Sequence, residues 1–464
     1  MKKQQETIPE PTSFLKRLYA SVFPGMSRSV KGPKRSSRFF NAFILHVRPR
    51  SVPEKTVQFT LTWGLGGMAL VLVMLLFGTG LMLKFFYLPF PDKAYESILI
   101  LQNGILFGGL IRNIHHWSGN FLLVVVFLHF LRVFLTGAFH SPRQFNWVIG
   151  LCLFLIVLLS NFTGYLLPWD QLSFWAVTIS LGMLDYIPYG GEWLKEFIQG
   201  GGEMGPATLS NFYAIHTAVL PISLLFFMGF HFWRVRKARG VVVPHRPDEI
   251  LEGGGESVPS IPNLLLREVT VALVVIAFIL VFSIFFDAPL ESKANPGLSP
   301  NPTKAPWYFM GFQELLLHFH PMFSLFVIPF CMGLWLLAIP YRNYRVDTGG
   351  IWLASYKGRR MALMAVLFAV VTTVGGILLD EYVTGFFTWI PDLPAYMANG
   401  LIPFSVTLGL ILGFNIYVKR FYSANLNETV QTVAILLLTA FVTLTAIGIW
   451  FRGTGMKLVW PWGV

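Results

Sequence analysis

The sequence predicts an all-α membrane protein with about nine transmembrane helices, the first four forming a bundle. Of its 464 residues, 54% are hydrophobic and only 12% are charged, whereas soluble domains carry about 25% charged residues. A helix needs about 20 apolar residues to cross the hydrocarbon core. The runs that meet this requirement are residues 57–87, 113–136, 146–167, 211–234, 268–286, 321–340, 361–379, 401–418 and 429–451.

The distribution of positive charge supports this helix count. Nine spans place the two termini on opposite sides, and 27 of the 35 lysines and arginines then fall on the side of the N-terminus. By the positive-inside rule this side is cytoplasmic, so we expect a multi-pass protein of a prokaryotic cytoplasmic membrane. The net charge of +12 is explained by this placement, and we expect no nucleic-acid partner.

The segments outside the spans divide the chain into five parts. Residues 1–56 hold twelve lysines and arginines, and "TSFLKRLYASVF" within them predicts an amphipathic helix on a membrane surface. Residues 57–243 form the four-helix part and 244–267 a Gly/Pro-rich linker. Residues 268–380 hold three helices and 381–464 two more. The long loops before the fourth and sixth spans predict short surface helices.

Four histidines occur at matched depths in the second and fourth predicted helices. His115 and His129 are fourteen residues apart, and His216 and His231 are fifteen apart. Fourteen residues advance a helix by about 21 Å through close to four full turns, so each helix carries its two histidines on one face. Zinc-binding helices usually carry ligands at i and i+4, a spacing that is absent. One axial histidine from each helix suits two stacked haems, one per leaflet, in preference to packing histidines.

Glycines repeat the same interval in the first and third helices. Gly66 and Gly80 are fourteen residues apart, and so are Gly150 and Gly164. A single glycine in a membrane helix is well explained by close helix packing. The shared interval in all four helices instead indicates positions where a haem edge approaches the backbone.

Three arginines are candidates for binding the anionic haem propionates. Arg112 precedes the first histidine by one turn, Arg132 follows the second by one turn, and Arg236 lies five residues beyond the last. Arg112 is on the outer side, against the charge trend, which favours the functional interpretation there. For Arg132 and Arg236, ordinary cytoplasmic flanking charge is an equal alternative.

Three stretches carry a resemblance to a known family. "GGLIRNIHHWSGNFLLVVVFLHFLRVFLTGAF", "FTGYLLPWDQLSFWAV" and "LSNFYAIHTAVLPISLLFFMGFHFWRVRK" resemble cytochrome b of the quinol-oxidising bc complexes. The fifteen-residue spacing and "PWDQLSFWAV" are most similar to the b6 type. Residues 268–379 resemble the separate subunit four of the b6f complex, here fused to the first part. The last two helices lie beyond the family's seven-helix pattern.

The resemblance implies a function in a Q-cycle. In such a dimeric complex, quinol is oxidised at the outer face, and one electron passes to a Rieske iron–sulfur protein and on to a c-type cytochrome. The other electron crosses two bis-histidine b haems to reduce quinone near the cytoplasm, coupled to proton translocation. The resemblance assigns His115 and His216 to the outer, low-potential haem and His129 and His231 to the inner haem.

The resemblance also locates an outer quinol site. "TGYLLPWDQ" supplies Tyr165, and "KAPWYFMGFQELL" supplies Pro306, Trp307 and Tyr308. Ala-Pro here replaces the Pro-Glu of the family's Pro-Glu-Trp-Tyr motif, so the glutamate thought to accept a quinol proton is missing. Glu314 lies eight residues after that position, about two helical turns. We expect it to act as a substitute proton acceptor, and an interfacial carboxylate facing water is the alternative.

A second departure concerns an additional haem. The b6 type attaches one covalently through a cysteine before Leu-Gly-Gly in its first helix, where "TWGLGG" has Gly64. We therefore expect two b haems, quinol or quinone as the other ligand, and no covalently attached haem.

Two rival interpretations of the function remain. The first is a di-haem membrane anchor of a dehydrogenase or hydrogenase, which does not require "PWDQ" or "PWYF". The second is a non-redox transporter, which predicts broken helices and intramembrane carboxylates.

Overall fold

A computed structural model of the chain describes residues 14–22, 51–244, 256–344, 349–384 and 393–461. Within these residues, nine helices are long and apolar enough to cross a membrane, which confirms the predicted all-α membrane fold. Their bounds are Leu65–Lys84, Gly108–Leu135, Gln144–Leu166, Pro206–Lys237, Ser260–Phe285, Phe323–Tyr341, Tyr356–Val383, Met397–Phe421 and Leu426–Trp450.

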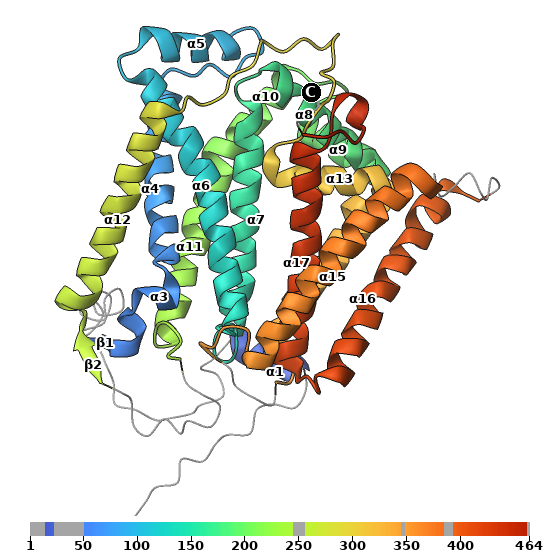
Figure 1. The fold of residues 1–464 in the computed structure, drawn as a ribbon. Helices are drawn as coiled ribbons and strands as arrows, with labels where there is room; N and C mark the ends of the chain where they lie inside the picture. Colours follow the sequence, from blue (N-terminus) through green and yellow to red (C-terminus); the bar gives the residue numbers. More distant parts are fainter. Residues whose placement is uncertain (1–13, 23–50, 245–255, 345–348, 385–392, 462–464) are drawn as a thin grey trace, which may run out of the picture.

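The first four spans form one bundle. It consists of α4 (Leu65–Lys84), α6 (Gly108–Leu135), α7 (Gln144–Leu166) and α11 (Leu220–Lys237), which α10 (Pro206–Ala214) and a π-helical turn extend. Leu72, Leu122, Val157 and Leu224 are buried together in its apolar core. The fifth span, α12 (Ser260–Phe285), packs on the outside of α4 and α6 (Figure 1). The bundle thus contains both helices that carry the four predicted histidine ligands.

The first predicted span, residues 57–87, is interrupted near its start. A short helix, α3 (Phe59–Thr62), ends at Trp63 and Gly64, whose φ angles of 53° and 65° lie in the left-handed region. A right-handed helix cannot continue through such residues, so α4 begins only at Leu65. The break leaves the carbonyl of Leu61 free to accept a hydrogen bond from Arg132 Nε at 2.8 Å.

Part of the predicted linker is structured. Residues 257–259 form β2 (Ser257–Pro259), which pairs antiparallel with β1 (Ser51–Pro53), and α12 begins directly afterwards. The C-terminal part of the predicted linker, residues 244–267, therefore holds β2 and the first turns of α12. Residues 245–255 of that linker lie outside the described residues.

The N-terminal amphipathic helix forms where it was predicted. Helix α1 (Phe14–Val22) packs on the ends of α7 and a short turn after α14 (Ile328–Ala338). Arg234 donates to the carbonyl of Ser21 at 2.5 Å, and the Phe14 ring lies edge-on to that of Tyr341 at 5.7 Å. The helix is therefore docked on the protein, while Leu15 remains 73% exposed for contact with a membrane surface.

Short helices gather at one end of the bundle, the upper end in Figure 1. They are α5 (Ala94–Gly104), α8 (Gln171–Gly182), α9 (Gly191–Gln199), α10 and α13 (Met310–His318). The predicted surface helices in the two long loops are confirmed by α8, α9 and α13, whereas α5 was not predicted. Asp170 joins the two loops, since it caps α8 through Ser173 N and accepts a hydrogen bond from Glu291 N at 3.1 Å.

The last spans form a second group beside the bundle. Helices α15 (Tyr356–Leu379), α16 (Ile402–Phe421) and α17 (Leu426–Trp450) bury Met361, Phe414 and Leu436 between them. Within this group α17 lies nearest to the four-helix bundle (Figure 1), and α13 packs against its upper half. The two helices beyond the seven-helix pattern are therefore packed into the protein rather than appended to it.

Candidate functional site

The four histidines form two pairs inside the bundle. The ring centroids of His115 (α6) and His216 (the π-helical turn before α11) are 6.2 Å apart, and those of His129 and His231 are 6.5 Å apart. Both pairs have interplanar angles of 74°. The pairing is the one that the fourteen- and fifteen-residue spacings predicted, and we refer to the two as the upper and lower histidine pairs.

Each pair fits a single metal ion between its rings. A bond from a first-row metal to a histidine nitrogen is about 2.0 Å long, and the ring centroid lies about 1.1 Å further, so in-line coordination separates two centroids by about 6.3 Å. The observed values lie on either side of this estimate. Within the described residues no group of three or more His, Cys, Asp or Glu could hold a metal. Two facing histidine rings are the axial ligand set that a b-type haem takes.

The tautomer of the upper histidines is set by hydrogen bonds to their Nδ1 atoms. His216 Nδ1 lies 3.0 Å from the carbonyl oxygen of Ser160, which can only accept, so Nδ1 carries the proton. The hydroxyl of Thr79 lies 3.0 Å from Nδ1 of His115 and itself donates to the Leu75 carbonyl at 2.6 Å. This hydroxyl therefore accepts from His115, and Nε2 of both rings is left to bind metal.

Two threonines that contact the upper histidines were not predicted from the sequence. Thr163 lies 3.2 Å from Nδ1 of His216 and donates to the Leu159 carbonyl, as Thr79 does on α4. Each threonine directly precedes a predicted glycine, in "GTGL" and "FTGY". The recurrence of Thr-Gly in the first and third helices was the available signal. Leu and Ile occupy the same position before the lower glycines, so the two pairs differ in their support.

Each of the four predicted glycines faces a histidine ring. A Cβ atom built on Gly164 would lie 2.6 Å from Cε1 of His216, and one built on Gly80 would lie 3.1 Å from the ring beside it. For Gly66 and Gly150 the corresponding distances are 3.7 and 3.8 Å. The absence of side chains at these glycines therefore makes room for the histidine rings, and the approach is closest at the upper pair. The interpretation from the sequence instead assigned this space to the edge of a haem.

The predicted propionate arginines have different surroundings. Arg112 is buried and donates to the carbonyls of Ala288 at 2.8 Å and Pro289 at 2.6 Å, which fastens α6 to the loop after α12. Arg132 is also buried, and its Nη2 has no hydrogen-bond partner among the described residues. A buried donor of this kind needs an acceptor, and a haem propionate supplies one. Arg132 is therefore the arginine that fits the predicted role most closely.

On α11 the buried cation is Arg234 rather than Arg236. Arg234 is 4% exposed and lies over the Phe145 ring at 5.2 Å, whereas Arg236 is only half-buried. Arg234 is held in place by its hydrogen bond to the Ser21 carbonyl of α1 and by its contact with the Phe145 ring. The propionate role of Arg236 stays a prediction.

The predicted quinol-site residues meet at the upper end. Tyr308 packs against the bundle core, and the pKa of its phenol is raised by burial and by the nearby Tyr165. Trp307 Nε1 donates to Asn120 Oδ1 on α6 at 2.8 Å, and Pro306 is buried beside it. The structure thus brings α7 and the "PWYF" segment together next to the helix that carries the upper histidine His115.

Glu314 is fully buried and ion-paired, so the water-facing alternative is wrong. Its carboxylate accepts from Arg452 Nη2 at 2.6 Å and from Arg452 Nε at 3.0 and 3.1 Å. Burial alone would raise the pKa of this carboxyl, but the bonds from His318 and Arg452 lower it below its usual value. The role as proton acceptor stays a prediction, and the ion pair opposes it because it stabilises the charged form.

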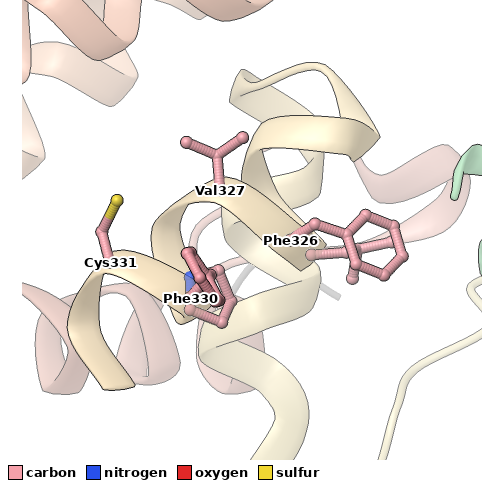
Figure 2. Close-up of a pocket in the computed structure, with 6 residues that line it drawn as sticks. Phe326, Val327, Phe330 and Cys331 are labelled. Carbon is pink, nitrogen blue, oxygen red and sulfur yellow. The ribbon is translucent and has the colours of Figure 1, made fainter. Parts of the chain in front are cut away.

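An apolar groove lies away from these residues. Figure 2 shows Phe326, Val327, Phe330 and Cys331 around it, on one turn and the start of α14. Phe330 is 66% exposed, and no charged side chain lines the groove. The groove lies on the sixth span, and none of the predicted site residues contributes to it.

Comparisons with known proteins agree with this geometry. The family model described as cytochrome b/b6/petB matches residues 51–239. Cytochrome b6 of Prochlorococcus marinus (strain AS9601) is 43% identical over 173 residues, which cover 37% of this chain and 79% of the relative. Cytochrome b6 of Synechococcus elongatus is also 43% identical, over 37% of this chain and 80% of the relative.

A solved structure extends the similarity of fold beyond the bundle. A chain of a hyperthermophilic respiratory complex III matches with a TM-score of 0.63 and 22% identity, covering 89% of this chain and 97% of that one. At this identity the match concerns the fold alone. The sequence relatives, the family model and the two histidine pairs carry the assignment: the chain is a multi-pass electron-transfer protein of the cytochrome b/b6 family and binds b-type haem.

Proposed function

We propose that the protein is the cytochrome b subunit of a quinol–cytochrome c reductase that works by a Q-cycle. The observation that carries this proposal is the two histidine pairs, one above the other between α6 and the segment formed by the π-helical turn and α11, with ring-centroid separations of 6.2 and 6.5 Å. Two bis-histidine b haems held there would supply one-electron transfer across the membrane, since no iron position stays open for oxygen chemistry.

The residues of the chain support this chemistry in distinct ways. The hydroxyls of Thr79 and Thr163 hold the upper rings in the Nδ1–H tautomer, which directs Nε2 toward the metal. Arg132 offers a buried cation to the lower propionates. Tyr165 and Tyr308 border the proposed outer quinol site, where quinol would lose its protons and electrons close to the upper pair.

The proposed assembly is the one that the family resemblance implies. We expect a homodimer with a Rieske iron–sulfur protein and a c-type cytochrome as partners, in a prokaryotic cytoplasmic membrane with the N-terminus in the cytoplasm. The excess of lysine and arginine on the side of the N-terminus supports this orientation. Quinol oxidation is then at the outer face and quinone reduction at the inner face, near the lower pair.

Purification of the complex from its native membrane tests the proposal. A haem assay should give two non-covalent b haems per chain, and quinol should reduce both of them. Co-purification of a Rieske protein separates this function from a di-haem dehydrogenase or hydrogenase anchor. Haems that quinol cannot reduce, or a complex containing a dehydrogenase and no Rieske protein, would contradict the proposal. Haem that stays on the chain after denaturing extraction would contradict the expectation from Gly64.

A further inference from the structure

Helix α13, which follows the "PWYF" segment, lies directly on the last transmembrane helix. A Cβ atom built on Gly311 would come within 2.6 Å of Thr445 Oγ1, and one built on Gly448 within 3.1 Å of Met310 Cε. The absence of side chains at these two glycines allows the helices to approach closely. The ring of Phe312 also contacts that of Phe441 at 5.0 Å. Helix α13 is therefore packed closely against α17.

A buried ion pair joins α13 to the residues just after α17. The guanidinium of Arg452, just after α17, binds both carboxylate oxygens of Glu314, and the two side chains are 1% and 0% exposed. Arg452 Nη1 also donates to Glu381 at 3.1 Å and to the carbonyl of Met456 at 2.8 Å. A two-pronged arginine–carboxylate pair of this kind fixes orientation as well as distance.

The "PWYF" segment is in turn tied to α13 and α17. The Gln313 side chain accepts from Ala305 N at 2.8 Å and donates to the Thr303 carbonyl at 2.7 Å. Lys304 Nζ donates to the carbonyl of Ile449 on α17 at 2.9 Å. Trp307 and Tyr308, which follow at once, therefore take their position from the same two helices.

We propose that Arg452 is a positioning residue for the outer quinol site and that α17 is part of that site's scaffold. The proposal rests on the proposed function, because it concerns the quinol oxidised there. Arg452 holds Glu314, Glu314 sets the placement of α13, and α13 places Trp307 and Tyr308. Glu314 then serves as the partner of an arginine and not as a proton acceptor.

The purified complex with its Rieske and cytochrome subunits provides the test. Arg452→Met leaves the Glu314 carboxylate buried without its partner, which is strongly destabilising locally. We expect the KM for quinol to rise about tenfold or more, with two haems per chain and unchanged haem potentials. Arg452→Lys, which keeps the charge but loses the two-pronged contact, should give a smaller rise. Arg420→Met, at an exposed position on α16, is the matched control.

A double variant separates positioning from acid–base chemistry. Glu314→Gln with Arg452→Met removes the ion pair without leaving either charge of that pair buried alone. Because the two-pronged contact is lost as well, we expect the KM for quinol to stay raised about tenfold, by the same factor at every pH. A double variant with the KM of the wild type, or with a loss that varies with pH, overturns the inference, and so does an Arg452→Lys protein with an unchanged KM. Wild-type haems that quinol cannot reduce would instead count against the proposed function itself.

Discussion

The hydroxyl of Thr163 lies 3.2 Å from Nδ1 of His216, and it belongs to the residue directly before the glycine that the same ring contacts. One short segment of α7 therefore both makes room for the ring and sets its tautomer. Thr79 and Gly80 do the same on α4 for His115. This local repeat gives the upper pair a support that the lower pair does not share.

Removal of the threonine hydroxyls should change the potential of the upper haem. An acceptor on Nδ1–H raises the basicity of a histidine ligand, which favours the oxidised metal. Thr79→Val, which removes the hydroxyl that accepts from His115 Nδ1, should therefore raise the upper potential by about 40 mV, the equivalent of one hydrogen bond worth about 1 kcal/mol. A redox titration followed by absorbance measures this shift. Thr372→Val on α15, where the hydroxyl bonds only to backbone, should leave both potentials in place.

The glycines should tolerate alanine to different degrees. Gly164→Ala places a Cβ atom 2.6 Å from the His216 ring, so either the ring or the backbone must move. We expect loss of the upper haem and about one haem per chain in a haemochrome assay. Gly150→Ala meets its ring at an ordinary 3.8 Å and should keep two haems. Equal haem content in the two variants would contradict the geometry described here.

The buried cluster around His318 should give the upper end a pH-dependent stability. Burial lowers the pKa of His318, but its bonds to Asp380 at 2.5 Å and to Glu314 outweigh burial and raise the pKa to about 9. The stabilisation is therefore complete below a pH of about 6.5 and is lost as the pH rises through about 9. The shift corresponds to about 3 kcal/mol. Arg452 and, through it, Glu381 are the other charged groups of the cluster.

Hydrogen exchange of α13 at pH 6, 8 and 10 measures this dependence. Protection in the wild type should fall between pH 8 and 10, whereas His318→Asn should show low protection at pH 6 already. His320→Asn, two residues away, serves as the control and should follow the wild type. If the protection of α13 in the wild type is the same from pH 6 to 10, the proposed effect of His318 is wrong.

Arg132 Nη2 has no hydrogen-bond partner among the residues that the structure describes, and this predicts an effect of Arg132 on the lower haem. A nearby cation stabilises the reduced, more negative form, so Arg132→Gln should lower the potential of the lower haem. An interaction worth about 1 kcal/mol corresponds to about 40 mV. Arg239→Gln, an exposed position beyond α11, is the matched control. If both variants shift the lower potential equally, long-range charge and not propionate binding is the cause.

Most of the membrane architecture could be predicted from local patterns. Apolar runs of sufficient length predicted all nine spans found in the described residues, because the bilayer sets the minimum length of a spanning helix. The helix boundaries were predicted less accurately. The start of the first span was missed because the sequence "FTLTWGLGG" does not indicate that Trp63 and Gly64 adopt left-handed φ angles. The short helix α5 was missed because its polar residues weaken the apolar pattern.

The sequence by itself determined the two-level arrangement of the histidines and glycines, because a helical period converts residue spacing directly into depth and face. Only the tertiary structure decided what those residues contact. Arg452 and Glu314 are 138 residues apart, and their ion pair arises from the packing of α13 on α17. Contacts between distant segments depend on the packing of whole elements, which no local period encodes. For this reason the environment of Glu314 and the role of the last helix became apparent only in the fold.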